Sequence, residues 1–235
     1  MKIPVSVNCS SCGFDFSALG YADERFRAAT CPKCGVKIHI LDPLSISVIA
    51  ERLLHRSQYE ISEGDYTLSI ICSAMAVESA LTQVFLRWKG LDNQKLTRRL
   101  ASDDEKDSWL QEYRKQTSPG GFEKSVDFVS KFLCGTQFDD FVDAFLQRSN
   151  EVALIKAGFP QDKSQLKVSH IQKELFVRRN QIMHLGKLDY QLEDASNALT
   201  SALSVFAVLK VMDREKCLAE DQARRESLGK PNSGL

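Results

Sequence analysis

The stretch that decides the fold is DYTLSIICSAMAVESALTQVFLRWK, residues 65–89. Its side chains are apolar around most of a helical circumference, which predicts a helix that is buried on nearly every side. A second segment of this kind lies within residues 190–225, where Leu199, Leu203 and Phe206 recur at near-helical spacing. Two core helices of this character predict a mainly α protein, built as a helical bundle.

The helical period of 3.6 residues continues over most of the chain after Asp42-Pro43. Beside the two core helices, it predicts helices at about 44–60, 103–116, 122–134, 138–148 and 164–185. Loops are expected at Pro119-Gly120-Gly121 and at Gly158-Phe159-Pro160. We therefore expect three parts: a small module at 1–41, a helical domain at 42–225 and a disordered tail at 226–235.

The composition is that of an ordinary globular protein. Of 235 residues, 43% are hydrophobic and 26% are charged, which excludes a disordered or low-complexity chain. Lys+Arg and Asp+Glu are both 31, so the zero net charge argues against a protein that coats nucleic acid, although a local basic site stays open. The most apolar window, 68–77, is too short to span a bilayer, and the start lacks a secretory signal. We expect a cytoplasmic protein without membrane association.

Four of the seven cysteines form two Cys-x-x-Cys pairs, Cys9 with Cys12 and Cys31 with Cys34. Two thiolates at this spacing can face one ion, and two such pairs complete a tetrahedral zinc site with no open position. The second pair lies in CPKCG, which closely resembles the zinc-ribbon family. We therefore expect a β zinc ribbon at 1–41, folded around structural zinc. Redox Cys-x-x-Cys pairs are the disfavoured alternative, because no thioredoxin-like βαβ pattern surrounds them.

The glycines of this module and the segment after its last cysteine predict local backbone conformation, and its aromatic residues have two possible roles. Gly13 and Gly35 follow the second cysteine of each pair, where a knuckle turn favours positive φ. The alternating sequence VKIHIL at 36–41 predicts a strand. The aromatic residues between the pairs are either the small core of the ribbon or a stacking platform for bases: Phe14, Phe16, Tyr21 and Phe26.

The segment that carries candidate chemistry is ELFVRRNQIMHLGKL, residues 174–188. Asn180 and His184 are four residues apart and share a helix face, and the long Arg179 side chain can reach the same side. Gly186 is predicted to end the helix in a left-handed conformation, which puts His184 in the last turn. An imidazole moves protons near neutral pH, and a guanidinium binds phosphate in bidentate fashion.

This segment resembles the motif of the HEPN superfamily, an Arg followed by a polar residue and then a His, here Arg179, Asn180 and His184. The helix at 65–89 with its inward acid Glu78 is similar to a further family element, and the likeness extends over about 44–215. Arg178 leaves the register of the motif open by one residue. The resemblance implies a helical bundle in which Glu78 positions Arg179.

The same resemblance implies an activity and partners. It implies a metal-independent endoribonuclease that cleaves RNA by attack of the ribose 2′-OH, acting as a toxin or antiviral defence effector. Because one His and one Arg per chain are few for this chemistry, a homodimer that sets two motifs face to face is expected. A partner defence or antitoxin protein is a further expectation.

Two other functions remain open on the sequence. One is a non-catalytic HEPN scaffold or sensor whose zinc ribbon binds a partner protein or nucleic acid. The other is a regulator whose ribbon binds DNA, which the mild charge supports poorly. A single His at a helix end is commonly a cap or a surface residue, and an Arg and a Glu on neighbouring helices commonly form an ion pair.

Overall fold

The computed structural model describes residues 2–8, 15–21, 27–35, 37–40, 48–118, 121–150, 154, 159–160 and 162–228. Over these residues the protein is mainly helical, as predicted. Several predictions fall outside them, namely those on Cys9, Cys12 and Gly13, on the loop residues Pro119, Gly120 and Gly158, and on the tail after Leu228.

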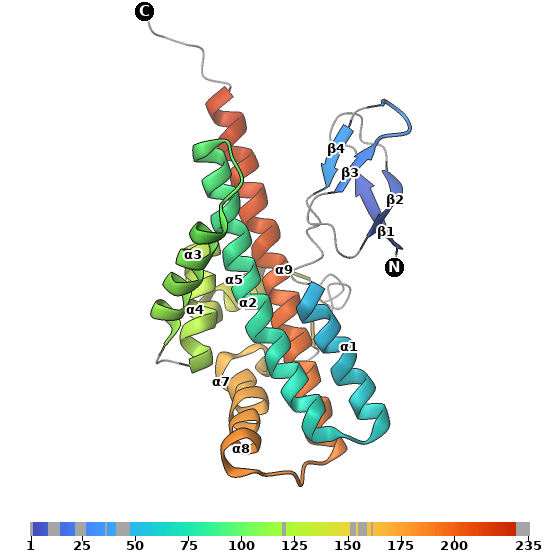
Figure 1. The fold of residues 1–235 in the computed structure, drawn as a ribbon, viewed down its shortest axis with the longest axis vertical. Coiled ribbons are helices and arrows are strands. Elements are labelled where there is room, and N and C mark those ends of the chain that lie inside the picture. The colour runs from blue at the N-terminus through green and yellow to red at the C-terminus, as the bar shows by residue number, and fades with distance from the viewer. Residues whose placement is uncertain are drawn as a thin grey trace, which may run out of the picture.

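Two long helices form the centre of the bundle, α2 (Tyr66–Thr97) and α9 (Leu192–Leu228). They run alongside each other, with α1 (Val48–Glu63) packed against both (Figure 1). The two helices bury several small side chains, which lets their backbones approach: Ala74, Ala76 and Ala80 on α2, and Ala195, Ala198 and Ala202 on α9. The prediction of two core helices is therefore confirmed.

These two helices are also long and apolar enough to cross a membrane, judged by length and composition alone. In each of them 61% of the apolar window is buried inside the protein. The central helices of a bundle are buried to this extent, so their position in the core explains their apolar character. The cytoplasmic location stays a prediction.

A polar contact ties α2 to α9 within the core. Asp213 on α9 is 1% exposed and accepts a hydrogen bond of 2.7 Å from the indole N–H of Trp88. The same carboxylate pairs with the guanidinium of Arg87. Because a buried carboxylate without partners is costly, these two donors on α2 fix how α9 lies against it.

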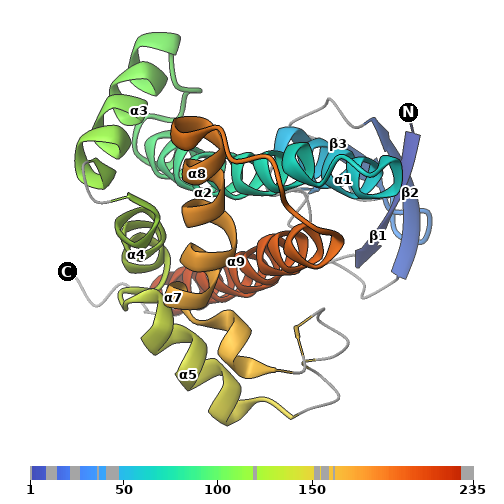
Figure 2. The same ribbon diagram turned by 90° about the horizontal axis from the view of Figure 1, so that it is seen from below.

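Three shorter helices cover one side of this pair: α3 (Asp103–Thr117), α4 (Gly121–Cys134) and α5 (Phe138–Arg148) (Figure 2). Their bounds agree with the predicted helices within one residue. Aromatic rings join α2 to α3 and α4, since Phe85 lies 5.6 Å from Tyr113, 5.2 Å from Phe128 and 5.0 Å from Phe132 between ring centroids. This side of the bundle forms one wall of the candidate site described below.

The segment predicted as one helix at 164–185 has a more varied backbone. A 3₁₀ turn, η1 (Lys163–Leu166), leads into α7 (Val168–Ile171), then a π-helical stretch, η2 (Gln172–Val177), and then α8 (Arg178–Leu185). The prediction of regular α-helix was therefore wrong over 172–177. A π-helical stretch needs more residues per turn, so it rotates the residues of α8 relative to those of α7.

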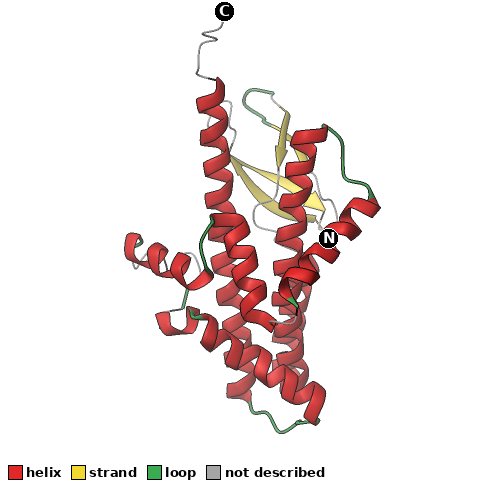
Figure 3. Ribbon diagram, turned by 90° about the vertical axis from the view of Figure 1, so that its left-hand side faces the viewer, coloured by secondary structure: helices red, strands yellow, loops and turns green. Residues whose placement is uncertain are grey.

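The N-terminal module contains two antiparallel hairpins (Figure 3). Strand β1 (Lys2–Asn8) pairs with β2 (Asp15–Tyr21), and β3 (Arg27–Thr30) pairs with β4 (Lys37–Ile40). Strand β4 lies within the strand predicted at 36–41. Between β3 and β4, Gly35 has a φ of +71° and donates its N–H to the carbonyl of Cys31 at 2.9 Å, which confirms the predicted turn.

Candidate functional site

Arg179 and Glu78 meet across the contact between α8 and α2. The Nη2 group of Arg179 donates to both carboxylate oxygens of Glu78, at 2.9 and 3.1 Å, and its Nη1 group donates to Oδ1 of Asn180 at 3.1 Å. The Arg179 side chain is 30% exposed and that of Glu78 is 46% exposed. The guanidinium is therefore held in one place while part of it stays open to solvent.

Arg178 has a different environment. Its guanidinium lies 2.5 Å from Oε2 of Glu174, which is 4% exposed, and also pairs with Asp194 at the start of α9. The backbone N–H of Gln191 and the charge of Arg178 hold the pKa of Asp194 below its usual value. Arg178 thus joins η2, α8 and α9 as a structural ion pair, so Arg179 is the arginine that faces the candidate site.

His184 lies in the last turn of α8, exposed to solvent, as predicted. Gly186 ends the helix with φ 63° and ψ 27°. Its N–H donates to the carbonyl of Ile182 at 3.1 Å, which is the bond of an αL C-cap, and the N–H of Lys187 donates to the carbonyl of Gln181 at 3.3 Å.

The chain after α8 folds back onto that helix. Tyr190 is 7% exposed, and its hydroxyl lies 2.9 Å from Oε1 of Gln181 and 3.2 Å from the carbonyl of Arg178. The connection between α8 and α9 is thereby fixed to the helix that carries the motif. His184 is consequently presented from a supported helix end.

A pocket of about 380 Å³ lies beside Arg179. One of its walls carries Glu78, Arg179 and Asn180 from α2 and α8. Helices α3 and α4 also contribute to its lining, with residues that include Tyr113 and Arg114. The structure thus brings Glu78, Arg179 and Asn180 to one pocket, whereas His184 lies one helical turn beyond its lining.

Sequence reasoning missed the α3–α4 wall of this pocket. Burial raises the pKa of the Tyr113 hydroxyl above its ordinary value of 10.0, so this phenol stays protonated at neutral pH. The nearby hydroxyls of Thr82 and Ser125 lower this pKa and so oppose the effect of burial in part. No signal in the sequence pairs Tyr113 or Arg114 with a motif more than sixty residues further along the chain, because that contact is purely tertiary.

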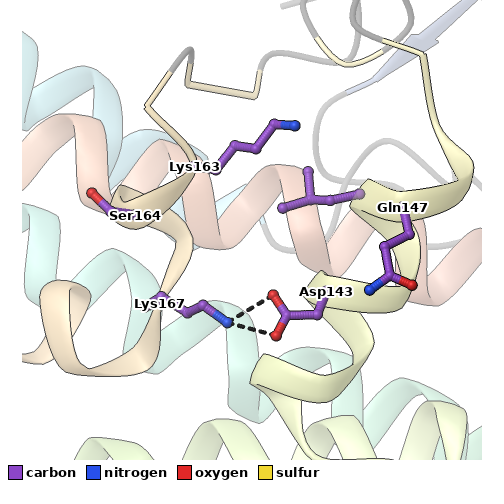
Figure 4. Close-up of a pocket in the computed structure, with 6 residues that line it drawn as sticks. Asp143, Gln147, Lys163, Ser164 and Lys167 are labelled. Atoms are coloured by element: carbon purple, nitrogen blue, oxygen red, sulfur yellow. Dashed lines mark hydrogen bonds and ion pairs between the residues drawn. The ribbon is translucent and has the colours of Figure 1, made fainter.

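A second pocket of about 390 Å³ is lined by Asp143, Leu146, Gln147, Lys163, Ser164 and Lys167. Figure 4 shows the ammonium group of Lys167 directed at the Asp143 carboxylate, with Nζ–O distances of 2.7 and 2.8 Å. The charges that line this pocket therefore partly neutralise each other, and none of the candidate site residues lies there. It carries no argument for function.

The predicted zinc ligands are only partly within the described residues. Cys31 is buried at 1% exposure and Cys34 is exposed, at the two ends of the turn between β3 and β4. Among the residues that the structure describes, no group of three or more His, Cys, Asp or Glu residues could hold a metal ion. Since Cys9 and Cys12 lie outside that part of the chain, the zinc site stays a prediction.

Comparisons of the chain with known protein families, with curated proteins and with solved structures find no match. The likeness to the HEPN superfamily therefore depends on the motif and its surroundings alone.

Proposed function

We propose that this protein is a HEPN-type, metal-independent endoribonuclease, with Arg179, Asn180 and His184 as its catalytic residues. The observation that supports it is the arrangement around Arg179: Glu78 and Asn180 hold its partly exposed guanidinium at the edge of a pocket of about 380 Å³. Such a guanidinium is pre-positioned for a phosphate, which favours catalysis because little reorganisation is needed on binding. Glu78 acts as a positioning residue.

The proposed reaction is attack of the ribose 2′-OH on the neighbouring phosphate of RNA. The 2′-oxygen forms a bond to phosphorus, the bond from phosphorus to the 5′-oxygen breaks, and a 2′,3′-cyclic phosphate remains. His184 moves a proton, taking it from the 2′-OH or giving it to the leaving 5′-oxygen. Arg179 stabilises the charge that develops on the phosphorane, and Asn180 orients the phosphate.

We further propose that two copies of the chain form a homodimer through the end of α8. Large apolar side chains flank His184 there, with Met183 at 62%, Leu185 at 78% and Leu188 at 69% exposure. Adjoining exposed side chains of this size are unfavourable in water and typical of an interface. A second copy would cover them and bring a second His184, so one subunit can supply the base and the other the acid.

The N-terminal module is proposed to be a zinc ribbon in which Cys9, Cys12, Cys31 and Cys34 hold one structural zinc ion. The turn from Cys31 to Gly35 supports this, because its left-handed Gly35 and the hydrogen bond back to Cys31 suit a zinc knuckle. The ribbon is free to guide RNA or to contact a partner defence or antitoxin protein. The protein as a whole is proposed to act in the cytoplasm, as a toxin or antiviral defence effector.

A non-catalytic scaffold or sensor is the second candidate. One observation favours it: Arg179 is already paired with a carboxylate on a neighbouring helix, as a structural ion pair would be. In this case the bundle still dimerises, and the ribbon binds a protein or nucleic acid.

The deciding experiment measures cleavage of RNA by purified protein in the presence of EDTA. We expect wild type to leave 2′,3′-cyclic phosphate ends, and His184→Ala and Arg179→Ala to lower the rate by at least about 10²-fold. His55→Ala is the matched control, because His55 is an exposed histidine on α1, away from the site. Equal RNA decay with wild type and Arg179→Ala would discard the enzyme and leave the scaffold.

A further inference from the structure

The pocket beside Arg179 has an excess of positive charge. Two guanidinium groups line it, Arg179 from α8 and Arg114 from α3. Of the described residues that line it, Glu78 is the one carboxylate, and it already binds Arg179. The positive charge of Arg114 is therefore not balanced within the lining, which favours an anionic ligand.

Apolar side chains also line the same pocket. Phe122 of α4 and Phe176 of η2 stack with their ring centroids 4.4 Å apart and their planes 14° from parallel. Both are buried, at 5% and 7% exposure, and Leu81 is a third apolar residue of the lining. Apolar walls with a few placed polar groups are the usual character of a site for a small organic molecule, and 380 Å³ is within the usual range for one.

Polar groups for hydrogen bonding lie along the edge of the pocket. Asn180 and Gln172 contribute amides, and Thr117 and Ser118 contribute hydroxyls. Helix α4 begins at the same edge with Gly121, so the positive end of its dipole adds to the field of the two arginines. An anionic group, a flat apolar ring and hydrogen-bonding edges together are the chemistry of a nucleotide.

We propose that this pocket binds one nucleotide of the RNA substrate, with its phosphate between Arg114 and Arg179 and its base against the apolar lining formed by Phe122, Phe176 and Leu81. This inference rests on the proposed function and deepens it, because it locates nucleotide recognition within a single chain. The helices α3 and α4 then set which base is preferred at the cleavage position. The nucleophile and the proton transfer remain with the RNA and His184.

The test compares Arg114→Ala with Lys115→Ala. Both changes remove one positive charge from the same turn of α3, but only Arg114 lines the pocket. For a short RNA oligonucleotide, we expect Arg114→Ala to raise KM by about tenfold or more and to lower kcat less than Arg179→Ala does, since a charge-assisted bond to phosphate is lost. Lys115→Ala should change KM less than about twofold. Equal effects of the two variants would overturn the inference.

A binding measurement separates the inference from the nuclease proposal. Each nucleoside 5′-monophosphate and inorganic phosphate are tested for displacement of a labelled RNA from His184→Ala protein. We expect monophosphates to displace the RNA better than phosphate alone, and Ser118→Trp, which fills the pocket from its exposed edge, to abolish that binding. If inorganic phosphate displaces the labelled RNA as well as the nucleotides do, the apolar lining makes no contribution to binding and the proposed base site is contradicted.

The two proposals can fail separately. If wild type does not cut RNA but monophosphates and RNA compete for a site that Arg114→Ala removes, the nucleotide pocket stands and the nuclease fails. If wild type cuts RNA while Arg114→Ala and Ser118→Trp retain its full kcat/KM, the nuclease stands and the pocket fails. Monophosphates that bind without competition from RNA would overturn the assignment to the substrate strand.

Discussion

Arg178 and Arg179 are neighbours with opposite surroundings. The Arg178 side chain is 15% exposed and pairs with Glu174, which is 4% exposed, and with Asp194. Arg179 is 30% exposed and pairs with Glu78 at the edge of a pocket. Removal of one partner of a buried pair leaves an unpaired charge behind, whereas a partly exposed pair contributes little to stability.

We predict that Arg178→Met lowers the free energy of unfolding by about 3–5 kcal/mol and that Arg179→Met lowers it by less than about 1 kcal/mol. The measurement is urea denaturation followed by circular dichroism at neutral pH. Provided that both variants fold, Arg179→Met should lower the RNA cleavage rate more than Arg178→Met does. Equal losses of stability would mean that Arg178 is not the structural arginine.

The sequence identified the motif but not which arginine serves it. Arg178 and Arg179 are 100° apart on a helix, and their different fates depend on Glu174, Asp194 and Glu78, which approach only in the folded protein. The exposed His184 and the left-handed Gly186 were predictable, because a glycine stop is a local signal. The pocket wall from α3 and α4 was not, since it forms through tertiary packing.

At the scale of elements, the N-terminus of α3 has a complete capping box. The backbone N–H of Glu105 bonds to Oγ of Ser102 at 3.3 Å, and the Ser102 N–H bonds to Oε2 of Glu105 at 2.7 Å. Arg99 donates to both oxygens of the same carboxylate at 2.8 Å. These contacts fix the start of the helix that carries Arg114 into the pocket.

These contacts predict a pH dependence. The hydrogen bond from Arg99, and next the backbone bond from Ser102, lower the pKa of Glu105 from 4.5 to about 2. Because the folded state favours the carboxylate, its contribution to stability is complete above about pH 4.5 and is lost as the pH falls through 2. The stability difference between wild type and Glu105→Gln should therefore be constant from pH 5 to 7 and shrink below pH 4.5. A difference that stays the same down to pH 2 would contradict it.

The elements with a strong period were the most predictable. Helices α3, α4 and α5 begin and end within one residue of the prediction, because turn residues or caps flank them. Helix α2 was expected to end at 89 but continues to Thr97, so Gly90 lies inside it, and a Cβ at this position would lie 4.0 Å from the ring of Trp109. Packing against the neighbouring α3 outweighs the intrinsic cost of a glycine.

At the scale of the whole molecule, the exposed leucines predict an oligomeric state. Leu188→Glu should convert a dimer into a monomer, because a charge in an apolar interface is costly to desolvate. Leu96→Glu is the matched control, since Leu96 is 85% exposed near the far end of α2. Light scattering after size exclusion reads the mass, and RNA cleavage should fall only with Leu188→Glu. A monomeric wild type, or dimers with both variants, would contradict the proposed interface.

The cysteines predict a second property of the whole molecule. Burial raises the pKa of Cys134 to about 11 and also raises the pKa values of Cys72 and Cys217. At pH 8 these thiols are almost entirely protonated and should react slowly with a thiol reagent, because the thiolate is the nucleophile.

The proposed zinc ligands should behave differently. Elemental analysis should find one zinc per chain, and a strong chelator should release it and expose four fast-reacting thiols while the helical bundle stays folded. Cys134→Ser should leave that number at four, and Cys31→Ser should abolish stable zinc binding. Seven thiols that react at one rate, with or without chelator, would contradict a zinc ribbon.

The short link from Gly186 to Gln191 has a consequence for how chain length can vary. It contains Gly186 in the left-handed conformation and Tyr190, whose hydroxyl bonds to the carbonyl of Arg178 in α8. It also contains Gln191, whose N–H donates to Asp194 at 3.0 Å. Even one inserted residue would break this set of contacts and move Asp194 away from Arg178. Homologues of this chain should therefore differ in length at the turns on either side of α3 and α4 and keep an invariant spacing between His184 and Asp194.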